Sequence, residues 1–257
     1  RDETGVDRTT LRLYAPASAG PAVARAVAAA AEPGARVGPP EPVAPVDWTR
    51  AWQEGLTAIV ISPRLVVRPS FVEHTASRSQ QTVIIDPGRA FGTGHHASTR
   101  LALELLDRVL AGNRSGRGRL LDVGTGSGVL AIAALRLGIA SAVAFDLDLV
   151  AVRAAHGNAE RNGVRDRMEL FAGGLEALAE TGFELVTANL LRTELVPLVP
   201  GIARRIRAGG HVIVSGILAS ERDAVASHLS QAGLQCADLR TATDPGGDAW
   251  IGLLAQR

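Results

Sequence analysis

The order of apolar and polar positions changes near residue 97. Beyond it, short apolar runs without alternation take turns with segments of helical spacing. Strands are predicted at 118–123, 141–146, 168–173, 183–189, 211–217 and 249–255. Helices are predicted at 98–110, 128–138, 149–163, 193–210 and 220–233. Non-alternating strands that take turns with helices indicate an α/β fold, a mainly parallel sheet covered by helices on both faces.

Before residue 97 the pattern is weaker, and it predicts only a small α/β unit. We expect a strand at 11–14, an alanine-rich helix at 22–31 and a linker rich in glycine and proline up to about 45. A short helix should follow at 47–56, with Trp48 and Trp52 on one face as core or interface residues. Strands are predicted at 58–62, 65–69 and 81–87.

Composition narrows the class of protein. With 46% hydrophobic residues, 21% charged residues and a net charge of +1, the chain is expected to be globular, and its charge does not favour nucleic acid as a partner. All 27 basic residues are arginine, which we interpret as composition bias rather than a functional patch. The single cysteine, Cys236, excludes an intrachain disulfide and a Cys-rich zinc site, and it suits a reducing cytoplasm. No apolar run is long enough to span a bilayer, and the beginning, RDETGVDR, does not predict export.

A glycine-rich turn follows the first strand of the large region. In LLDVGTGSG, residues 120–128, the residues Gly124, Gly126 and Gly128 allow a tight turn and a close approach of backbone N–H groups to a ligand. Asp146 ends the next strand, 22 residues after Gly124. A carboxylate at about this offset accepts hydrogen bonds from ribose hydroxyls in related folds. The pattern therefore predicts a ligand that contains a nucleoside.

The spacing of the glycines bears on which nucleoside binds. A dinucleotide fingerprint would place its third glycine at position 129, where the chain has Val129. The G-x-G-x-G spacing suits a ligand without a pyrophosphate, and S-adenosylmethionine fits. A nicotinamide-dependent oxidoreductase stays open as an alternative, although Val129 opposes it.

Two further polar residues are expected at the same sheet edge. Asp122 lies on the first strand, and Asn189 ends the strand FELVTAN. An amide can both donate and accept hydrogen bonds, so Asn189 could contact the cofactor or align an amine for reaction; it could equally be a helix cap. The residues after it, Leu190-Leu191-Arg192, lack the prolines and aromatic ring that enzymes acting on a flipped base carry at this place.

The stretch IIDPGRAFGTGHHASTR, residues 84–100, allows three interpretations. A metal site on His95 and His96 lacks further ligands at suitable spacing, and we expect no metal. A phosphate loop of the Walker type needs a lysine, which the chain does not contain. A flap with glycine hinges remains, in which Phe91 would lie against a sulfonium and Ser98 and Thr99 would enter the next helix.

Several segments together resemble the ribosomal protein L11 methyltransferase family (PrmA). They are DPGRAFGTGHHASTRLAL, LLDVGTGSGVLAIAALRLG, AFDLD, NAERNGV, TANLL and SGIL. The resemblance implies a class I, Rossmann-like methyltransferase domain with a seven-stranded sheet and S-adenosyl-L-methionine as cofactor. It also implies a small N-terminal substrate-recognition domain of ferredoxin-like type. We accordingly expect that small domain at 1–50, an interdomain linker with strands at 51–90 and the methyltransferase domain at 91–257.

The resemblance also implies residue roles and a partner. Thr99, Gly124, Asp146 and Asn189 fall on the family's cofactor-binding positions. With Phe91, Asp122, Gly126 and Gly128 they form the predicted cofactor site, and Asn189 is the predicted catalytic residue. The expected activity is methylation of lysine side-chain and N-terminal amines of ribosomal protein L11. The enzyme is expected to be a cytoplasmic monomer, and neither direct recognition of nucleic acid nor a membrane is expected.

Three alternatives remain at this point. The acceptor could be a lysine of another protein, such as an electron-transfer flavoprotein subunit, or a small-molecule amine. A module that binds the cofactor and grips the ribosome without turnover is the third. No general base is assigned, because His95 and His96 suit a flap role as well as proton transfer.

Overall fold

The computed structural model describes residues 13–32, 35–41, 56–86, 96–112 and 118–257. The chain divides into two compact units, Arg1–Gly55 and Leu56–Arg257. In the first unit a 3-10 turn, Ala17–Ala19, leads into helix α1 (Gly20–Ala30), which confirms the predicted alanine-rich helix. Leu13 and Tyr14 lie in irregular backbone and are exposed, so the described part of the strand predicted at 11–14 is not a strand.

The remaining features expected of the N-terminal region stay predictions. The helix expected at 47–56, with Trp48 and Trp52, lies outside the described residues except for its last position. The ferredoxin-like type of the small domain and the domain bounds at 50 and 90 likewise stay predictions.

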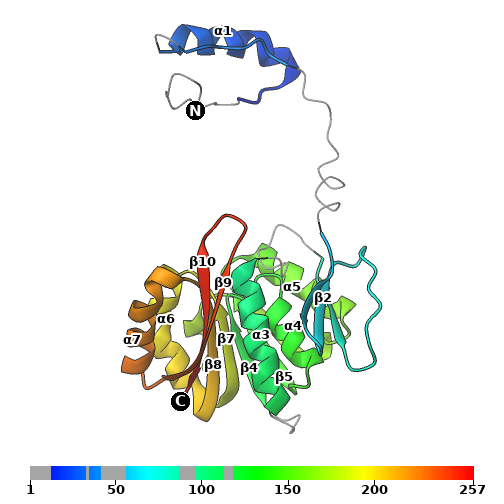
Figure 1. The fold of residues 1–257 in the computed structure, drawn as a ribbon, viewed down its shortest axis with the longest axis vertical. Helices are drawn as coiled ribbons and strands as arrows, with labels where there is room; N and C mark the ends of the chain where they lie inside the picture. Colours follow the sequence, from blue (N-terminus) through cyan, green and yellow to red (C-terminus); the bar gives the residue numbers. More distant parts are fainter. Residues whose placement is uncertain (1–12, 33–34, 42–55, 87–95, 113–117) are drawn as a thin grey trace. The chain divides into compact units, whose positions relative to one another are not determined.

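The second unit is built around a seven-stranded sheet (Figure 1). Its strands are β4 (Arg119–Val123), β5 (Ser141–Asp146), β6 (Met168–Ala172), β7 (Phe183–Asn189), β8 (Ile206–Leu218), β9 (Gln235–Thr243) and β10 (Ala249–Gln256). The spatial order is β6-β5-β4-β7-β8-β10-β9, and β10 runs antiparallel to the other six strands. The chain moves outward from β4 to β5 and β6, then returns to the other side of β4 with β7. This reversal is where open parallel sheets bind ligands.

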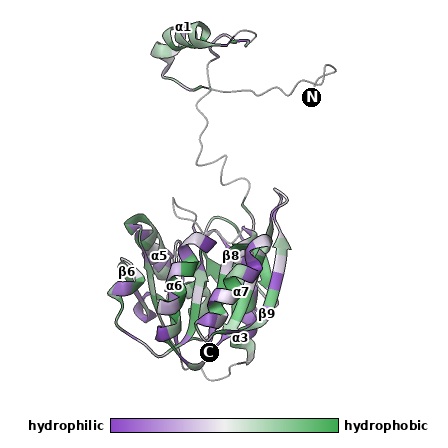
Figure 2. Cartoon of the chain, turned by 90° about the vertical axis from the view of Figure 1, so that its left-hand side faces the viewer, coloured by the Kyte–Doolittle hydropathy of each residue, from purple (hydrophilic) through white to green (hydrophobic). Residues whose placement is uncertain are grey.

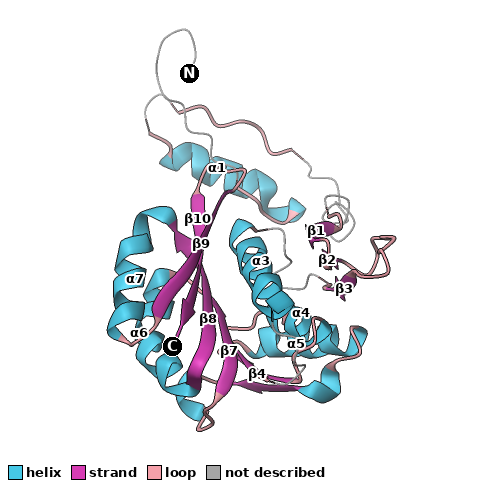
Figure 3. Ribbon diagram, turned by 60° about the horizontal axis from the view of Figure 1, so that its bottom comes forward, coloured by secondary structure: helices cyan, strands magenta, loops and turns pink. Residues whose placement is uncertain are grey.

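Helices cover both faces of this sheet, as Figure 3 shows. One face carries α3 (Ala97–Gly112), α4 (Val129–Arg136) and α5 (Leu149–Arg161); the other carries α6 (Arg192–Arg205) and α7 (Arg222–Gln231). The buried residues form two clusters, one against each face. On β4, Leu120 belongs to the first cluster and Leu121 to the second, because successive side chains on a strand point to opposite faces. The predicted fold class is therefore confirmed.

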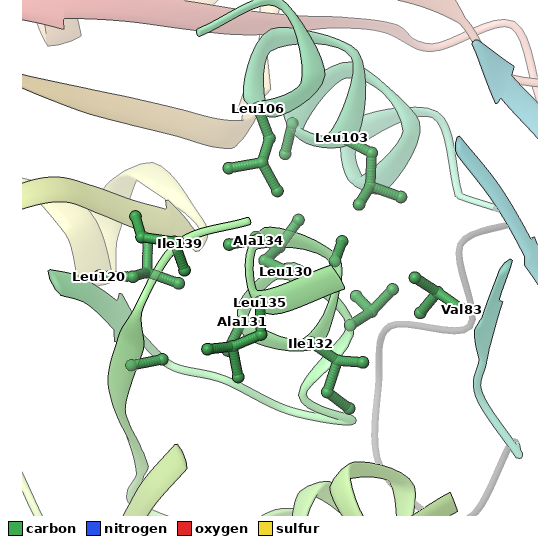
Figure 4. Close-up of a cluster of buried hydrophobic side chains, with 14 of the residues drawn as sticks. Val83, Leu103, Leu106, Leu120, Leu130, Ala131, Ile132, Ala134, Leu135 and Ile139 are labelled. Carbon is green, nitrogen blue, oxygen red and sulfur yellow. The ribbon is translucent and has the colours of Figure 1, made fainter. Parts of the chain in front are cut away.

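The hydropathy of the chain follows these layers (Figure 2). The inner strands are hydrophobic, whereas α6 and α7 have hydrophilic residues on their outer sides. Helix α4 differs, because all of its residues from Val129 to Leu135 are buried. In Figure 4 its side chains face Leu103 and Leu106 of α3, Leu120 of β4 and Val83. A helix that is apolar all round must be enclosed on all sides.

Val83 belongs to a second, smaller sheet that packs against α4. Its strands are β1 (Ile59–Ser62), β2 (Leu65–Arg68) and β3 (Gln81–Ile84), all three of which were predicted. Strand β1 is antiparallel to β2, and β2 is parallel to β3. Their buried residues join the core cluster of α3 and α4, so this sheet belongs to the same core as the first face of the large sheet.

Two predictions near the C-terminal region need correction. The helix predicted at 193–210 ends at Arg205, and Ile206 begins β8, because its buried side chain lies opposite Phe183 of β7. Strand β9 was not predicted, because its residues are mostly exposed and polar at the edge of the sheet. The last strand, β10, lies against α3. A Cβ added at Gly252 would be 3.1 Å from the Cβ of Leu101, which is closer than ordinary van der Waals contact.

Candidate functional site

The glycine turn connects β4 to α4 at the reversal of strand order. Gly124 has φ 69° and Gly128 has φ 83°, both in the left-handed region that favours glycine. A Cβ at Gly124 would be 2.5 Å from Cδ2 of Leu190, so a side chain at this position would have to displace Leu190. The backbone N–H of Thr125 donates to the carbonyl oxygen of Phe145 at 2.9 Å. The turn is thereby tied to β5.

Asp146, at the end of β5, holds the turn and remains open to a ligand. Its Oδ2 accepts from the backbone N–H of Gly126 at 2.9 Å, and its Oδ1 accepts from that of Asp148 at 3.0 Å. An ionised carboxylate has about four acceptor positions, and two are left. The side chain is only partly buried, so a pair of ribose hydroxyls can reach it. The residues at this point fit the nucleoside of the predicted cofactor.

An apolar surface that the sequence reasoning missed lies beside Asp146. Leu147 is 81% exposed, and Leu149 and Val150 are also exposed at the start of α5. Large apolar side chains that are exposed together often mark a binding surface, whereas single exposed ones are ordinary. The signal available in the sequence was LDLV after the acidic residue, where a turn would ordinarily be polar. A planar base bound through its ribose at Asp146 would have this surface within reach.

Asp122 is enclosed by the fold. Its Oδ2 accepts from the hydroxyl of Thr125 at 2.7 Å, and its Oδ1 accepts from that of Thr187 at 2.6 Å. Burial raises the pKa of the Asp122 carboxyl, and the two hydroxyl hydrogen bonds oppose that shift. The side chain links β4, the glycine turn and β7. Its direct contact with the cofactor stays a prediction, whereas its support of the turn is visible in these bonds.

Asn189 ends β7 and is not a helix cap, because the N-cap of α6 is Leu191. Its Nδ2 donates to the hydroxyl of Thr99, in the first turn of α3, at 3.1 Å. A Cβ added at Gly216 of β8 would be 2.9 Å from Oδ1 of Asn189 and 2.6 Å from the carbonyl oxygen of Leu190. Two acceptor oxygens therefore converge above a residue without a side chain. Gly216 was not among the predicted site residues.

Gly216 lines a pocket of about 240 Å³. Its lining residues are Leu191, Arg192, Thr193, Gly216, Leu218, Glu221 and Trp250. The salt bridge between Arg192 and Glu221, 2.8 Å long, neutralises the charges on one wall, and the rest is mainly apolar. A larger hollow of about 300 Å³ lies between α6 and α7, but it contains none of the predicted site residues. The pocket at Gly216 is the one that adjoins Asn189.

His96 and Trp250 form one side of this region. Their rings meet edge to face with centroids 4.7 Å apart, and Nε1 of Trp250 donates to Asp244 at 2.8 Å. Nδ1 of His96 accepts from the backbone N–H of Ser98 at 3.3 Å and lies 2.8 Å from its hydroxyl oxygen. The ring of His96 thus lies between the start of α3 and Trp250.

Several predictions for the stretch 84–100 lie outside the described residues. Phe91, His95 and both glycines of the predicted flap are among them, so their roles stay predictions. In the described part of the chain, no three histidine, cysteine or acidic residues are grouped to hold a metal ion. Within the same residues, no helix is long and apolar enough to cross a membrane.

Comparison with known proteins gives one consistent result. A ribosomal protein L11 methyltransferase of Symbiobacterium thermophilum is 38% identical over 211 residues, which are 82% of this chain and 66% of that protein. One of Sorangium cellulosum is 39% identical over 222 residues, or 80% of this chain and 69% of that one. The chain spans between 60% and 69% of the length of these two relatives and three others of the same description.

A solved structure agrees with these relatives. The ribosomal protein L11 methylase of Lactobacillus delbrueckii subsp. bulgaricus superimposes with a TM-score of 0.68 at 32% identity, covering 78% of this chain and 98% of that one. Residues 23–257 match the family described as ribosomal protein L11 methyltransferase (PrmA). The chain belongs to the ribosomal protein L11 methyltransferase family, as its motifs predicted.

Proposed function

We propose that the protein uses S-adenosyl-L-methionine to methylate lysine side-chain and N-terminal amines of ribosomal protein L11, in the cytoplasm. The observation that carries the proposal is that one edge of the sheet has two different sites side by side. The glycine turn and Asp146 offer a nucleoside site, and Asn189 places its side-chain oxygen beside a separate pocket. The family to which the chain belongs supports both the cofactor and the acceptor.

On the cofactor side, the chain contributes binding and orientation. Asp146 would accept hydrogen bonds from the ribose hydroxyls, the glycine turn would hold the amino-acid part, and Leu147 would offer apolar contact to the base. Bound there, S-adenosyl-L-methionine supplies a methyl group on a positively charged sulfur. These contacts fix the direction of transfer, so proximity and alignment account for most of the expected acceleration.

On the acceptor side, Asn189 and the carbonyl oxygen of Leu190 would accept hydrogen bonds from the amine. A lysine side chain has a pKa of about 10.4 in water, so the reacting amine must lose a proton on binding. The apolar walls of the pocket disfavour the charged form and lower that pKa. The two acceptor oxygens can then hold the remaining N–H bonds and direct the lone pair toward the methyl group. Leu191 and Trp250 would contact the aliphatic part of the side chain.

The test is methylation of purified L11 with isotope-labelled S-adenosylmethionine, followed by mass spectrometry of the modified peptides. We expect label on lysine residues and on the N-terminal amine. Matched substrates are L11 with each labelled lysine changed to arginine and L11 with an acetylated N-terminus, and each change should remove label only at its own site. Absence of label on L11 together with label on another protein in a cell extract would assign a different acceptor. Absence of any transfer would reject the activity.

A further inference from the structure

The last turn of α5 carries two buried asparagines in the sequence NAERN, at positions 158 and 162. Asn158 is 1% exposed and Asn162 is 7% exposed. Buried amide groups are almost always hydrogen-bonded, because an unpaired one is costly. Neither residue has a role in the site described above. Their hydrogen bonds show what each of them holds.

Asn158 joins two backbone segments that are far apart in the sequence. Its Nδ2 donates to the carbonyl oxygen of Ser127 at 2.9 Å, and its Oδ1 accepts from the backbone N–H of Asp86 at 3.2 Å. Both partners are backbone groups with fixed roles, so the orientation of the amide is determined by its surroundings. Ser127 lies in the glycine turn, and Asp86 follows the end of β3.

Asn162 makes similar bonds but does not reach the turn. Its Nδ2 donates to the carbonyl oxygen of Ile84 at 2.7 Å, and its Oδ1 accepts from the N–H of the same residue at 2.8 Å. Arg161 adds an ion pair to Asp86 with an N–O distance of 2.9 Å. The three residues thus hold the carboxyl end of β3. Among their hydrogen bonds, only that from Asn158 extends to the ligand side of the sheet.

The bond to Ser127 acts on the peptide group that begins α4. The N–H of that peptide, which belongs to Gly128, donates to the carbonyl oxygen of Thr125 at 2.9 Å, and Gly128 is the N-cap of the helix. The peptide is therefore held at both ends. One turn earlier on α5, Ala155 lies close to Gly128. A Cβ added at Gly128 would be 3.1 Å from the Cβ of Ala155. Helix α5 supports the glycine turn at these two neighbouring points.

We propose that Asn158 is a positioning residue for cofactor binding, which it serves by fixing the Ser127–Gly128 peptide in the glycine turn. The proposal rests on the proposed function, because it takes the turn to be the nucleoside site. Helix N-termini bind ligands through backbone N–H groups whose directions must be set in advance. Loss of the hydrogen bond from Asn158 would let the start of α4 shift, and affinity would fall without a change in any group that touches the ligand.

The discriminating variants are Asn158→Asp and Asn162→Asp. Each keeps the acceptor oxygen and replaces the donor by a second oxygen, which would face a carbonyl group. Of the two side chains, only that of Asn158 is hydrogen-bonded to the turn. S-adenosylhomocysteine binding is measured by calorimetry on the full chain, together with Tm and amide hydrogen exchange of a peptide that covers 124–128. We expect Asn158→Asp to raise Kd about tenfold and to speed exchange in this peptide, while Asn162→Asp lowers Tm with little change in either.

Asn158→Ala is measured alongside, because it removes both hydrogen bonds without burying a charge, and the same result is expected of it. The proposal is overturned if either folded Asn158 variant binds S-adenosylhomocysteine as the wild type does and exchanges normally at 124–128. It is also overturned if Asn162→Asp raises Kd equally at the same loss of Tm. Failure of the proposed function gives a different result, namely a wild-type chain that does not bind S-adenosylhomocysteine.

Discussion

The two halves of the ligand-binding edge are built differently. At β4 and β5 the polar groups bind one another: Asp122 takes two hydroxyl hydrogen bonds, and Asp146 holds the backbone of the glycine turn. At β7 and β8 the edge is open. Gly216 has no side chain, and Leu191 is 56% exposed beside the pocket.

This contrast separates two kinds of requirement. A cofactor has one shape, so its site can be fixed by backbone that the core holds in place. The proposed acceptor is a side chain or a terminus of another protein, so its site needs space and a few directing oxygens. Substitutions at β4 and β5 should therefore act on cofactor affinity. Those at β7 and β8 should act mainly on turnover of the acceptor and change cofactor affinity much less.

The largest effect is expected from Asp146→Ala. It removes hydrogen bonds to a charged group, worth about 1.5–3 kcal/mol each, so Kd for S-adenosylhomocysteine should rise about 100-fold or more by calorimetry. The matched control is Asp148→Ala, which removes the N-cap bond of Asp148 to the N–H of Val150 two residues further on. Unchanged binding in Asp146→Ala would contradict the placement of the ribose.

Asn189→Ala should act on the half of the sheet edge formed by β7 and β8. Loss of its oxygen leaves the amine poorly directed, and we expect kcat to fall about 100-fold, a loss typical of removing one positioned hydrogen-bonding group from an active site. Kd for S-adenosylhomocysteine should change much less than kcat. The measurement is turnover at saturating cofactor, with Tm recorded for both proteins. Full activity would remove Asn189 from the mechanism.

Gly216→Ala tests whether the open space beside Asn189 matters. The added methyl group would press on the carbonyl oxygen of Leu190, and a displacement of this size should lower kcat/KM for the acceptor about tenfold. Gly138→Ala is the control for backbone strain, because Gly138 also has a left-handed φ, at 109°, and a Cβ there meets nothing within 4 Å. Equal losses in the two variants would show that strain, rather than the site, is responsible.

The smallest effect is expected from Asp122→Asn, and it depends on pH. Burial raises the folded-state pKa of this carboxyl above its ordinary value of 3.8, so the folded protein holds the proton more tightly than the unfolded chain. The acid's contribution to stability is fully present below pH 3.8 and is lost as pH rises through the folded pKa. Asp122→Asn should therefore gain a few degrees in Tm relative to wild type at pH 7, and the gain should shrink toward pH 4. A gain that grows on acidification would contradict this assignment.

Much of the arrangement at this sheet edge could be predicted from sequence. Parallel strands bring their carboxyl ends to one edge, so Gly124, Asp146 and Asn189 were expected to meet there once the strands were recognised. The turn chemistry of Asn162-Gly163 likewise predicted the end of α5. These inferences work because they depend on local patterns and on one rule of topology.

What sequence could not predict depends on contacts between distant segments. The closeness of Gly216 to Asn189 follows from the register of β7 and β8, and the bond from Asn158 to Ser127 follows from how α5 crosses the turn. Strand β9 was missed because an exposed edge strand has no apolar pattern to reveal it. Helix α6 was predicted too long because the change from helix to strand at Ile206 is decided by burial against Phe183.

The tight contact of Gly252 with Leu101 has a consequence for biosynthesis. Helix α3 carries Thr99, the hydroxyl that receives the amide of Asn189, and it rests on a strand that is translated long after it. A nascent chain still lacking β10 lacks one of the strands against which α3 packs. If the protein acts as proposed, competence for methyl transfer should therefore arise only after β10 has been made and has paired with the sheet.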